Sequence, residues 1–360
     1  MMSIKNDIEE TSPANEELYY RLITLWVISE SVAGGIIHGL HLPFSGMFLS
    51  GFAVLCICLI GYYQGGKKGN TPSVNPRLTK KGAILKATII VCIFKMILSP
   101  NTPPSAYFAV LFQGFMGQIL FINLKHFKLS CILLGFIALI ESAGQRIIVL
   151  VLLYGAGFWN AVNEFITKLT HAKVITNYSM MLAIAYISIH GIFGILIGMW
   201  AYRLVHKSQF WKNTQPGLLI AELDTGTQFK PRSSLPKKRK IVRNIFIFIW
   251  ILLLLFFFQS LFKIGRTVLP SSKALQIILR SSLIFLTWYF LASPLITGFI
   301  KKKLQNQKEK STRDINRILL LLPSTENIFR KSWRLSSSRV GVKRIGFFWK
   351  IVLMNVLKDG

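Results

Sequence analysis

Six of the ionisable or amide side chains that interrupt the long apolar stretches of this 360-residue chain could contribute to one polar site. They are Glu30, Lys95, Gln113, Glu141, Arg146 and His190. In a lipid environment such groups are costly unless they face a cavity or one another, so each is a candidate functional residue. Acids, bases and an amide together provide the donors and acceptors that could bind a small polar or zwitterionic solute. The sequence therefore predicts a ligand-binding site built from these six residues.

The apolar stretches that carry these residues have the length of membrane-spanning helices. The composition is 52% hydrophobic and only 16% charged. Runs of about 20 apolar residues match a hydrocarbon layer of about 30 Å. Spans are predicted at 19–40, 42–63, 83–99, 105–123, 130–157, 178–205, 244–263 and 277–300. The predicted fold is all-α: a polytopic membrane protein with a six-helix bundle, two further transmembrane helices and a cytoplasmic amphipathic tail.

Changes in composition divide the chain into five parts. A polar N-terminal tail (1–18) precedes the six-helix solute-binding domain (19–205), and a basic cytoplasmic linker (206–243) precedes the two-helix membrane segment (244–300). In the last part (301–360), one side of a helix that is broken near Pro323 is predicted to be apolar, through Ile315, Leu319, Leu322, Ile328 and Phe329. Such a tail is expected to lie on membrane lipid or on a partner.

The net charge of +29 is distributed as the positive-inside rule requires. Lysines and arginines follow the second, fourth and sixth predicted spans, whereas the turn at 99–105 carries no charge. We therefore expect an inner (plasma) membrane protein with both termini in the cytoplasm. The basic runs lack the interleaved aromatic residues of single-strand binders, which argues against a nucleic-acid partner.

The helical rise of about 1.5 Å per residue gives an estimate of depth. By this measure Glu30, Gln113, Glu141 and His190 lie at similar depth, and a pocket open to the outside would collect them. An alternative interpretation stays open. Glu30 or Glu141 could pair with Lys95 or Arg146 in a buried ion pair that only fixes the packing of helices.

No motif of a known catalytic class is present. The chain has no P-loop, HExxH or GxSxG pattern, and its four cysteines all lie in apolar runs, where cysteine usually acts as a small hydrophobe. We therefore predict no enzymatic activity, metal or cofactor. A lipid-modifying enzyme is the weakest of the alternatives considered.

The first six predicted helices resemble the substrate-binding (S) component of energy-coupling factor vitamin transporters. The resemblance covers roughly 20–205, and its closest local match is TPPSAYF at 102–108, leading into QGFMG at 113–117. The chain departs from the family at Gln118, where an acid is expected. The resemblance implies an outward-facing vitamin site and small residues, here Gly46, Ser50 and Gly51, that dock on a transmembrane coupling subunit.

The C-terminal part resembles a reduced coupling (T) component of the same transporters. In that family, cytoplasmic helices end in short arginine-containing motifs that enter grooves on ATPase subunits. The nearest matches here are Trp333-Arg334-Leu335 and Ser338-Arg339-Val340, although both lack the expected small residues.

The expected function is capture of a small polar micronutrient from outside and its uptake with separate ATPase and coupling subunits. The alternative is a non-transporting membrane scaffold or assembly factor. In that case the polar groups would only hold the helices together.

Overall fold

A computed structural model describes residues 13–33, 45–64, 82–99, 102–122, 124–171, 177–214, 218–220, 248, 251, 255 and 273–358. Every regular element within these ranges is a helix, which confirms the prediction of an all-helical chain. Apart from residues 248, 251 and 255, the predicted span at 244–263 lies outside the described residues, as does most of the predicted linker at 206–243.

The described residues form helices that follow one another in sequence. The N-terminal half contains α1 (Pro13–Ile28), continued by the π-helical turn η1 (Ser29–Ala33), α3 (Ser45–Gln64), α4 (Ala83–Leu98), α5 (Pro104–Leu120), the short η2 (Leu124–His126), α6 (Phe127–Leu169) and α7 (Tyr178–Thr214). The C-terminal part contains α9 (Lys273–Thr287), η4 (Trp288–Ala292), α10 (Ser293–Lys310), α11 (Thr312–Leu335), η5 (Ser336–Ser338) and α12 (Val342–Val356).

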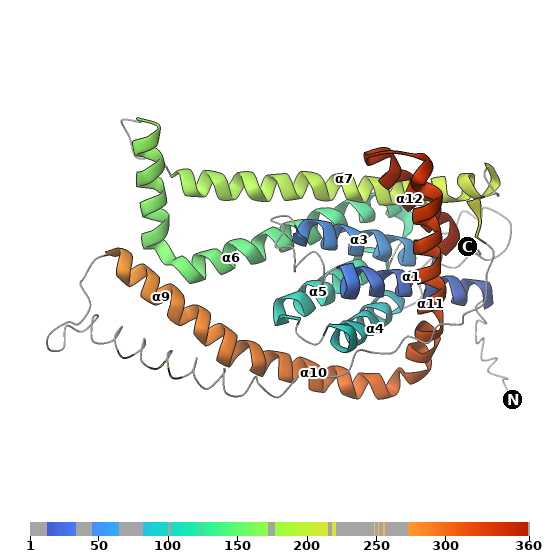
Figure 1. Cartoon of the computed structure of the whole chain (residues 1–360), viewed down its shortest axis with the longest axis horizontal. Coiled ribbons are helices and arrows are strands. Elements are labelled where there is room, and N and C mark those ends of the chain that lie inside the picture. Colours follow the sequence, from blue (N-terminus) through green and yellow to red (C-terminus); the bar gives the residue numbers. More distant parts are fainter. Residues whose placement is uncertain are drawn as a thin grey trace, which may run out of the picture.

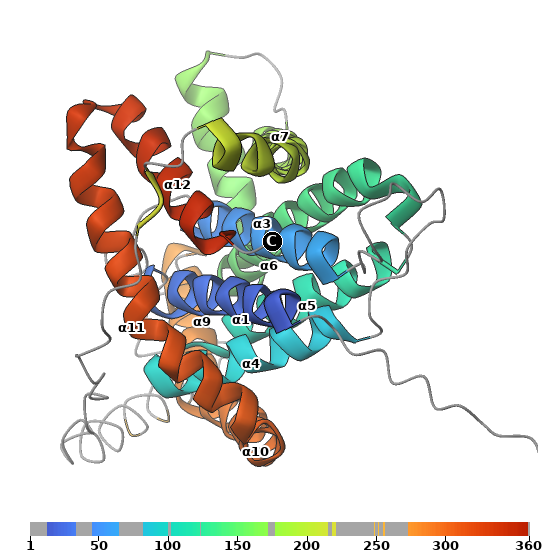
Figure 2. The ribbon, with the colours of Figure 1, turned by 90° about the vertical axis from the view of Figure 1, so that its right-hand side faces the viewer.

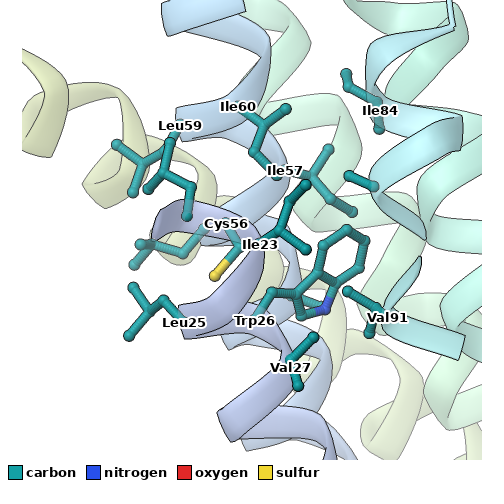
Figure 3. Close-up of a cluster of buried hydrophobic side chains, with 14 of the residues drawn as sticks. Ile23, Leu25, Trp26, Val27, Cys56, Ile57, Leu59, Ile60, Ile84 and Val91 are labelled. Carbon is teal, nitrogen blue, oxygen red and sulfur yellow. The ribbon is translucent and has the colours of Figure 1, made fainter. Parts of the chain in front are cut away.

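The hydrophobic core lies between α1, α3 and α4 (Figure 3). Helix α3 is apolar on all sides, which is typical of a helix buried all round. It contacts α1, α4, α5, α6 and α7 and is thus the central helix of the cluster. Trp26 of α1 is fully buried among the side chains of α3 and α4, near Ile57 and Val91.

Glycines allow α6 and α7 to cross closely. A Cβ on Gly135 would collide with the backbone of Gly194, and one on Gly198 would collide with the backbone at Cys131. Small residues permit this kind of contact between membrane helices. At the far end of α6, Gly155 has φ of +68°, which glycine adopts without a steric penalty, and the helix bends sharply there (Figure 1).

Four stretches of the described helices are long and apolar enough to cross a membrane: Gly46–Gln64, Phe127–Gly155, Tyr178–Ser208 and Ile278–Lys310. Except for the central Gly46–Gln64, most of their residues are not buried by protein, as expected for lipid-facing surfaces. The predicted spans at 83–99 and 105–123 correspond to α4 and α5, which have only 16 and 17 residues. Helix α1 begins at Pro13, within the predicted polar tail.

The C-terminal helices pack on the outside of this cluster. Helix α9 contacts α6, and α10 contacts α4 and α5. Helix α11 then crosses the end of the bundle at which α1 begins, and α12 returns beside it (Figures 1 and 2).

The tail differs from the sequence prediction in three respects. It packs on helices of its own chain, and α11 contacts α1. Leu319 is exposed, because the buried side of α11 runs through Ile315, Ile318 and Leu322. Helix α11 also continues through Pro323. A proline inside a helix costs about 3 kcal/mol, because it removes one backbone hydrogen bond and its ring clashes with the preceding turn.

Candidate functional site

A buried ion pair joins the first and third helices of the N-terminal cluster. The Lys95 ammonium lies 2.6 Å from Oε2 of Glu30, and the two side chains are only 8% and 5% exposed. The π-helical turn η1 positions Glu30, and the last turn of α4 positions Lys95. The sequence left open which acid pairs with which base. In the structure, Glu30 pairs with Lys95.

Further polar atoms surround this pair. Ser31 follows Glu30, and its carbonyl oxygen accepts a hydrogen bond of 3.4 Å from the Ser99 hydroxyl, one turn beyond Lys95. Among the described residues, the Ser31 hydroxyl and the Trp26 indole N–H are buried without a hydrogen-bond partner. Unsatisfied buried polar groups are uncommon, so these two mark the surroundings of Glu30 as a candidate polar site. Both groups lie within one helical turn of Glu30.

A second polar group lies where α3 meets α5 and α6. The Gln113 amide donates a hydrogen bond of 3.0 Å to the Ser50 hydroxyl, and the Gln113 carbonyl oxygen has no partner among the described residues. A Cβ on Gly46 would lie 2.7 Å from the Ser142 hydroxyl and 3.7 Å from Nη2 of Arg146. The structure thus brings Gln113 and Arg146 to neighbouring positions along α3.

The small residues Gly46, Ser50 and Gly51, predicted to dock on a separate subunit, all pack against helices of the same chain. Ser50 is buried and bonded to Gln113, Gly46 faces α6, and a Cβ on Gly51 would collide with Ile197 of α7. Their small size therefore serves contacts within the chain. In a sequence, close packing against the same chain and docking on another protein give the same small-residue pattern.

Glu141 and His190 lie on α6 and α7. The Gln145 amide donates a hydrogen bond to Glu141, and the other carboxylate oxygen of Glu141 has no partner among the described residues. His190 is buried, and its Nδ1 lies 2.9 Å from the Tyr186 carbonyl oxygen. The described contacts of Glu141 and His190 include neither Glu30 nor Lys95. The six predicted residues thus form separate local groups.

A polar clamp at the opposite end of α1 and α4 was not predicted. Asp314 of α11 accepts a hydrogen bond from Tyr20 of α1 and pairs at 2.9 Å with the ammonium of Lys86 in α4. Arg317 pairs at 2.8 Å with Glu16 and lies 4.8 Å from the centre of the Tyr20 ring. The one sequence signal was Asp314 itself, an acid within a basic tail.

The predicted coupling residues lie at the turn between α11 and α12. Arg334 and Arg339 are both exposed. The Arg339 guanidinium lies 5.3 Å from the centre of the Phe347 ring, which fixes its position beside α12.

Within the described part of the chain, no cluster of three or more His, Cys, Asp or Glu residues could hold a metal ion. Comparison with known proteins gives no family model, no curated protein and no solved structure that matches this chain.

Proposed function

We propose that this chain is a membrane uptake component that binds a small zwitterionic, vitamin-like solute from outside and transports it with separate ATPase subunits. The observation that carries the proposal is the buried Glu30–Lys95 pair, with unsatisfied polar atoms beside it. An ammonium group on the solute would replace Lys95 at Glu30, and a carboxylate would replace Glu30 at Lys95. A zwitterion can therefore exchange with the pair without leaving either charge uncompensated.

The same two helices connect this pair to the tail. Helix α1 carries Tyr20 at its middle and continues into η1, which carries Glu30. Helix α4 carries Lys86 in its first turn and Lys95 in its last turn. Asp314 contacts both Tyr20 of α1 and Lys86 of α4. A shift of α1 relative to α4 would therefore change at least one of these two contacts. In this proposal, exchange of the ion pair for the solute shifts α1 relative to α4, and α11 transmits the shift.

The exposed Arg334 and Arg339 would then present the shift to an ATPase subunit in the cytoplasm. Their exposed position where α11 ends and α12 begins supports this role. Inward release of the solute would follow when the ATPases close. The positive-inside distribution of lysine and arginine supports an inner membrane location with the tail in the cytoplasm.

Mass spectrometry of the purified full chain tests solute binding. We expect one small zwitterion to co-purify with the wild-type chain and to be reduced at least tenfold in Glu30→Gln, which removes the charge that holds the ammonium group. Glu326→Gln is the matched control, because Glu326 pairs only with the exposed Arg330 within α11 in the described contacts. Absence of any small molecule from a stable wild-type protein would favour the scaffold function, in which the ion pair only fixes packing.

A further inference from the structure

A cleft with basic walls and an aromatic floor opens where α3, α6 and α7 meet. Its volume is about 510 Å³. The residues with polar atoms that line it are Tyr62, Lys125, His126, Lys128, Tyr202 and His206. None of the residues that line the cleft is acidic. An anion is therefore the ligand that its charge favours.

The floor of the cleft is built from packed rings. The Phe127 ring lies 5.3 Å from that of Tyr62 and 6.1 Å from that of Tyr202, measured between centroids. The Lys128 ammonium lies 6.0 Å from the centre of the Tyr202 ring. Nδ1 of His206 lies 3.1 Å from the Tyr202 carbonyl oxygen. A carbonyl accepts only from a protonated nitrogen, so Nδ1 donates, and Nε2 would donate to an anion in the imidazolium form of His206.

The position of the cleft along the helices narrows the choice of anion. The apolar stretch of α6 begins at Phe127, and that of α7 ends at Ser208. If these two stretches cross a membrane, His206 and Lys128 lie within two residues of their ends, close to the level of the lipid headgroups. Leu129 and Ile132 continue the wall of the cleft along α6, and Leu129 is 53% exposed. The cleft is thus basic near the ends of the two apolar stretches and apolar beside them.

We propose that this cleft binds an anionic phospholipid, with the phosphate between Lys128 and His206 and an acyl chain along Leu129 and Ile132. The aromatic floor would pack beneath the glycerol, and the basic side chains would compensate the phosphate charge. Basic pockets between transmembrane helices on the cytoplasmic side recognise anionic lipid headgroups in this way. Because the lipid would contact both α6 and α7, it would bind the two long helices together at this end.

Native mass spectrometry of the full chain in detergent tests the proposal, with phosphatidylglycerol and phosphatidylcholine added in turn. We expect the wild-type chain to retain phosphatidylglycerol in preference to phosphatidylcholine. Lys128→Gln combined with His206→Gln should lower this retention by about tenfold, since each basic group near a membrane surface contributes several-fold to affinity. The matched control, Lys308→Gln with Lys310→Gln, removes two exposed charges from α10 and should keep the preference.

Two further variants separate the lipid from a soluble phosphate and from misfolding. Leu129→Gln keeps the basic walls and should still weaken phosphatidylglycerol retention, because it removes apolar contact with the acyl chain. Lys128→Gln alone, at an exposed position, provides a milder test if the double variant is unstable. Equal retention of phosphatidylglycerol by the wild type and by a folded Lys128→Gln chain would overturn the proposal. Displacement of the lipid by millimolar glycerol 3-phosphate would overturn the assignment to a lipid.

Discussion

At the scale of single residues, the Glu30–Lys95 pair links the stability of the bundle to its proposed function. Both side chains are almost fully buried, and loss of one partner leaves an uncompensated charge. The sequence identified both residues as unusual but could not choose between pairing with each other and pairing with Arg146 or Glu141. That choice depends on how α1, α4 and α6 are arranged, and side-chain types alone do not determine this arrangement.

A double-mutant cycle measures the packing contribution of the pair. Glu30→Leu alone should lower the free energy of unfolding by about 3–5 kcal/mol, because Lys95 stays buried without its partner. Glu30→Leu combined with Lys95→Leu should restore most of this loss, since two apolar side chains leave no buried charge. Thermal unfolding of the purified variants in detergent provides the comparison. A double variant less stable than either single variant would contradict the ion-pair interpretation.

At the scale of helices, the packing of α6 on α7 depends on the absence of side chains. Gly135 and Gly194 bring the two backbones into contact, whereas a Cβ on Gly144, also in α6, would meet no atom within 4 Å. The spacing Gly194-xxx-Gly198 is common in membrane helices and is compatible with such a close approach. A sequence does not identify Gly135 as the partner of Gly194, because spacing along one helix says nothing about the facing helix.

Alanine substitutions at Gly135 and Gly144 separate the effect of helix packing from the effect of helix propensity. Gly135→Ala should destabilise the chain by about 1–3 kcal/mol, because the added methyl group forces the helices apart. Gly144→Ala should be neutral or stabilise by roughly 0.5–1 kcal/mol, because alanine loses less backbone entropy than glycine in a helix. Unfolding by heat or denaturant in detergent measures both changes. Equal effects at the two positions would show that the close crossing does not contribute to stability.

At the scale of the whole molecule, the helical class and the long apolar stretches were predictable from hydropathy. The docking of the tail was not, because the apolar side of an amphipathic helix fits lipid, another protein or its own chain equally well. Gln118 illustrates a similar limit. The sequence marked it only as a departure from the resembling family. In the structure its side-chain oxygen accepts hydrogen bonds from the backbone N–H groups of Ile84 and Leu85 at the start of α4.

The contacts of Asp314 with Tyr20 and Lys86 are expected to hold α11 against α1 and α4. Asp314→Asn removes the charge that pairs with Lys86, so α11 should separate from α1 and α4 more often. Trypsin should then cleave the tail several-fold faster than in the wild-type chain, because cleavage tracks the open population. Glu326→Gln, which alters only an exposed pair within α11 in the described contacts, is the control. An unchanged cleavage rate in Asp314→Asn would contradict the role of the clamp.

Single introduced cysteines test the predicted topology. The native cysteines are all buried, so they provide a low background for labelling. A cysteine in place of Thr102 should react with an impermeant maleimide in intact cells. A cysteine in place of Lys310 should react only after the membrane is opened, because the basic tail is predicted to be cytoplasmic. Labelling of position 310 in intact cells would place the tail outside and would contradict the predicted orientation.

Solute binding by the variant that lacks the ion pair but keeps its fold tests the central claim most directly. The measurement is mass spectrometry of small molecules retained by purified wild-type chain and by Glu30→Leu with Lys95→Leu, at matched thermal stability. The account predicts that the wild type retains a zwitterion and that the stable double variant loses it. Retention of the same molecule in equal amount by both proteins would contradict the assignment of Glu30 and Lys95 to a solute site.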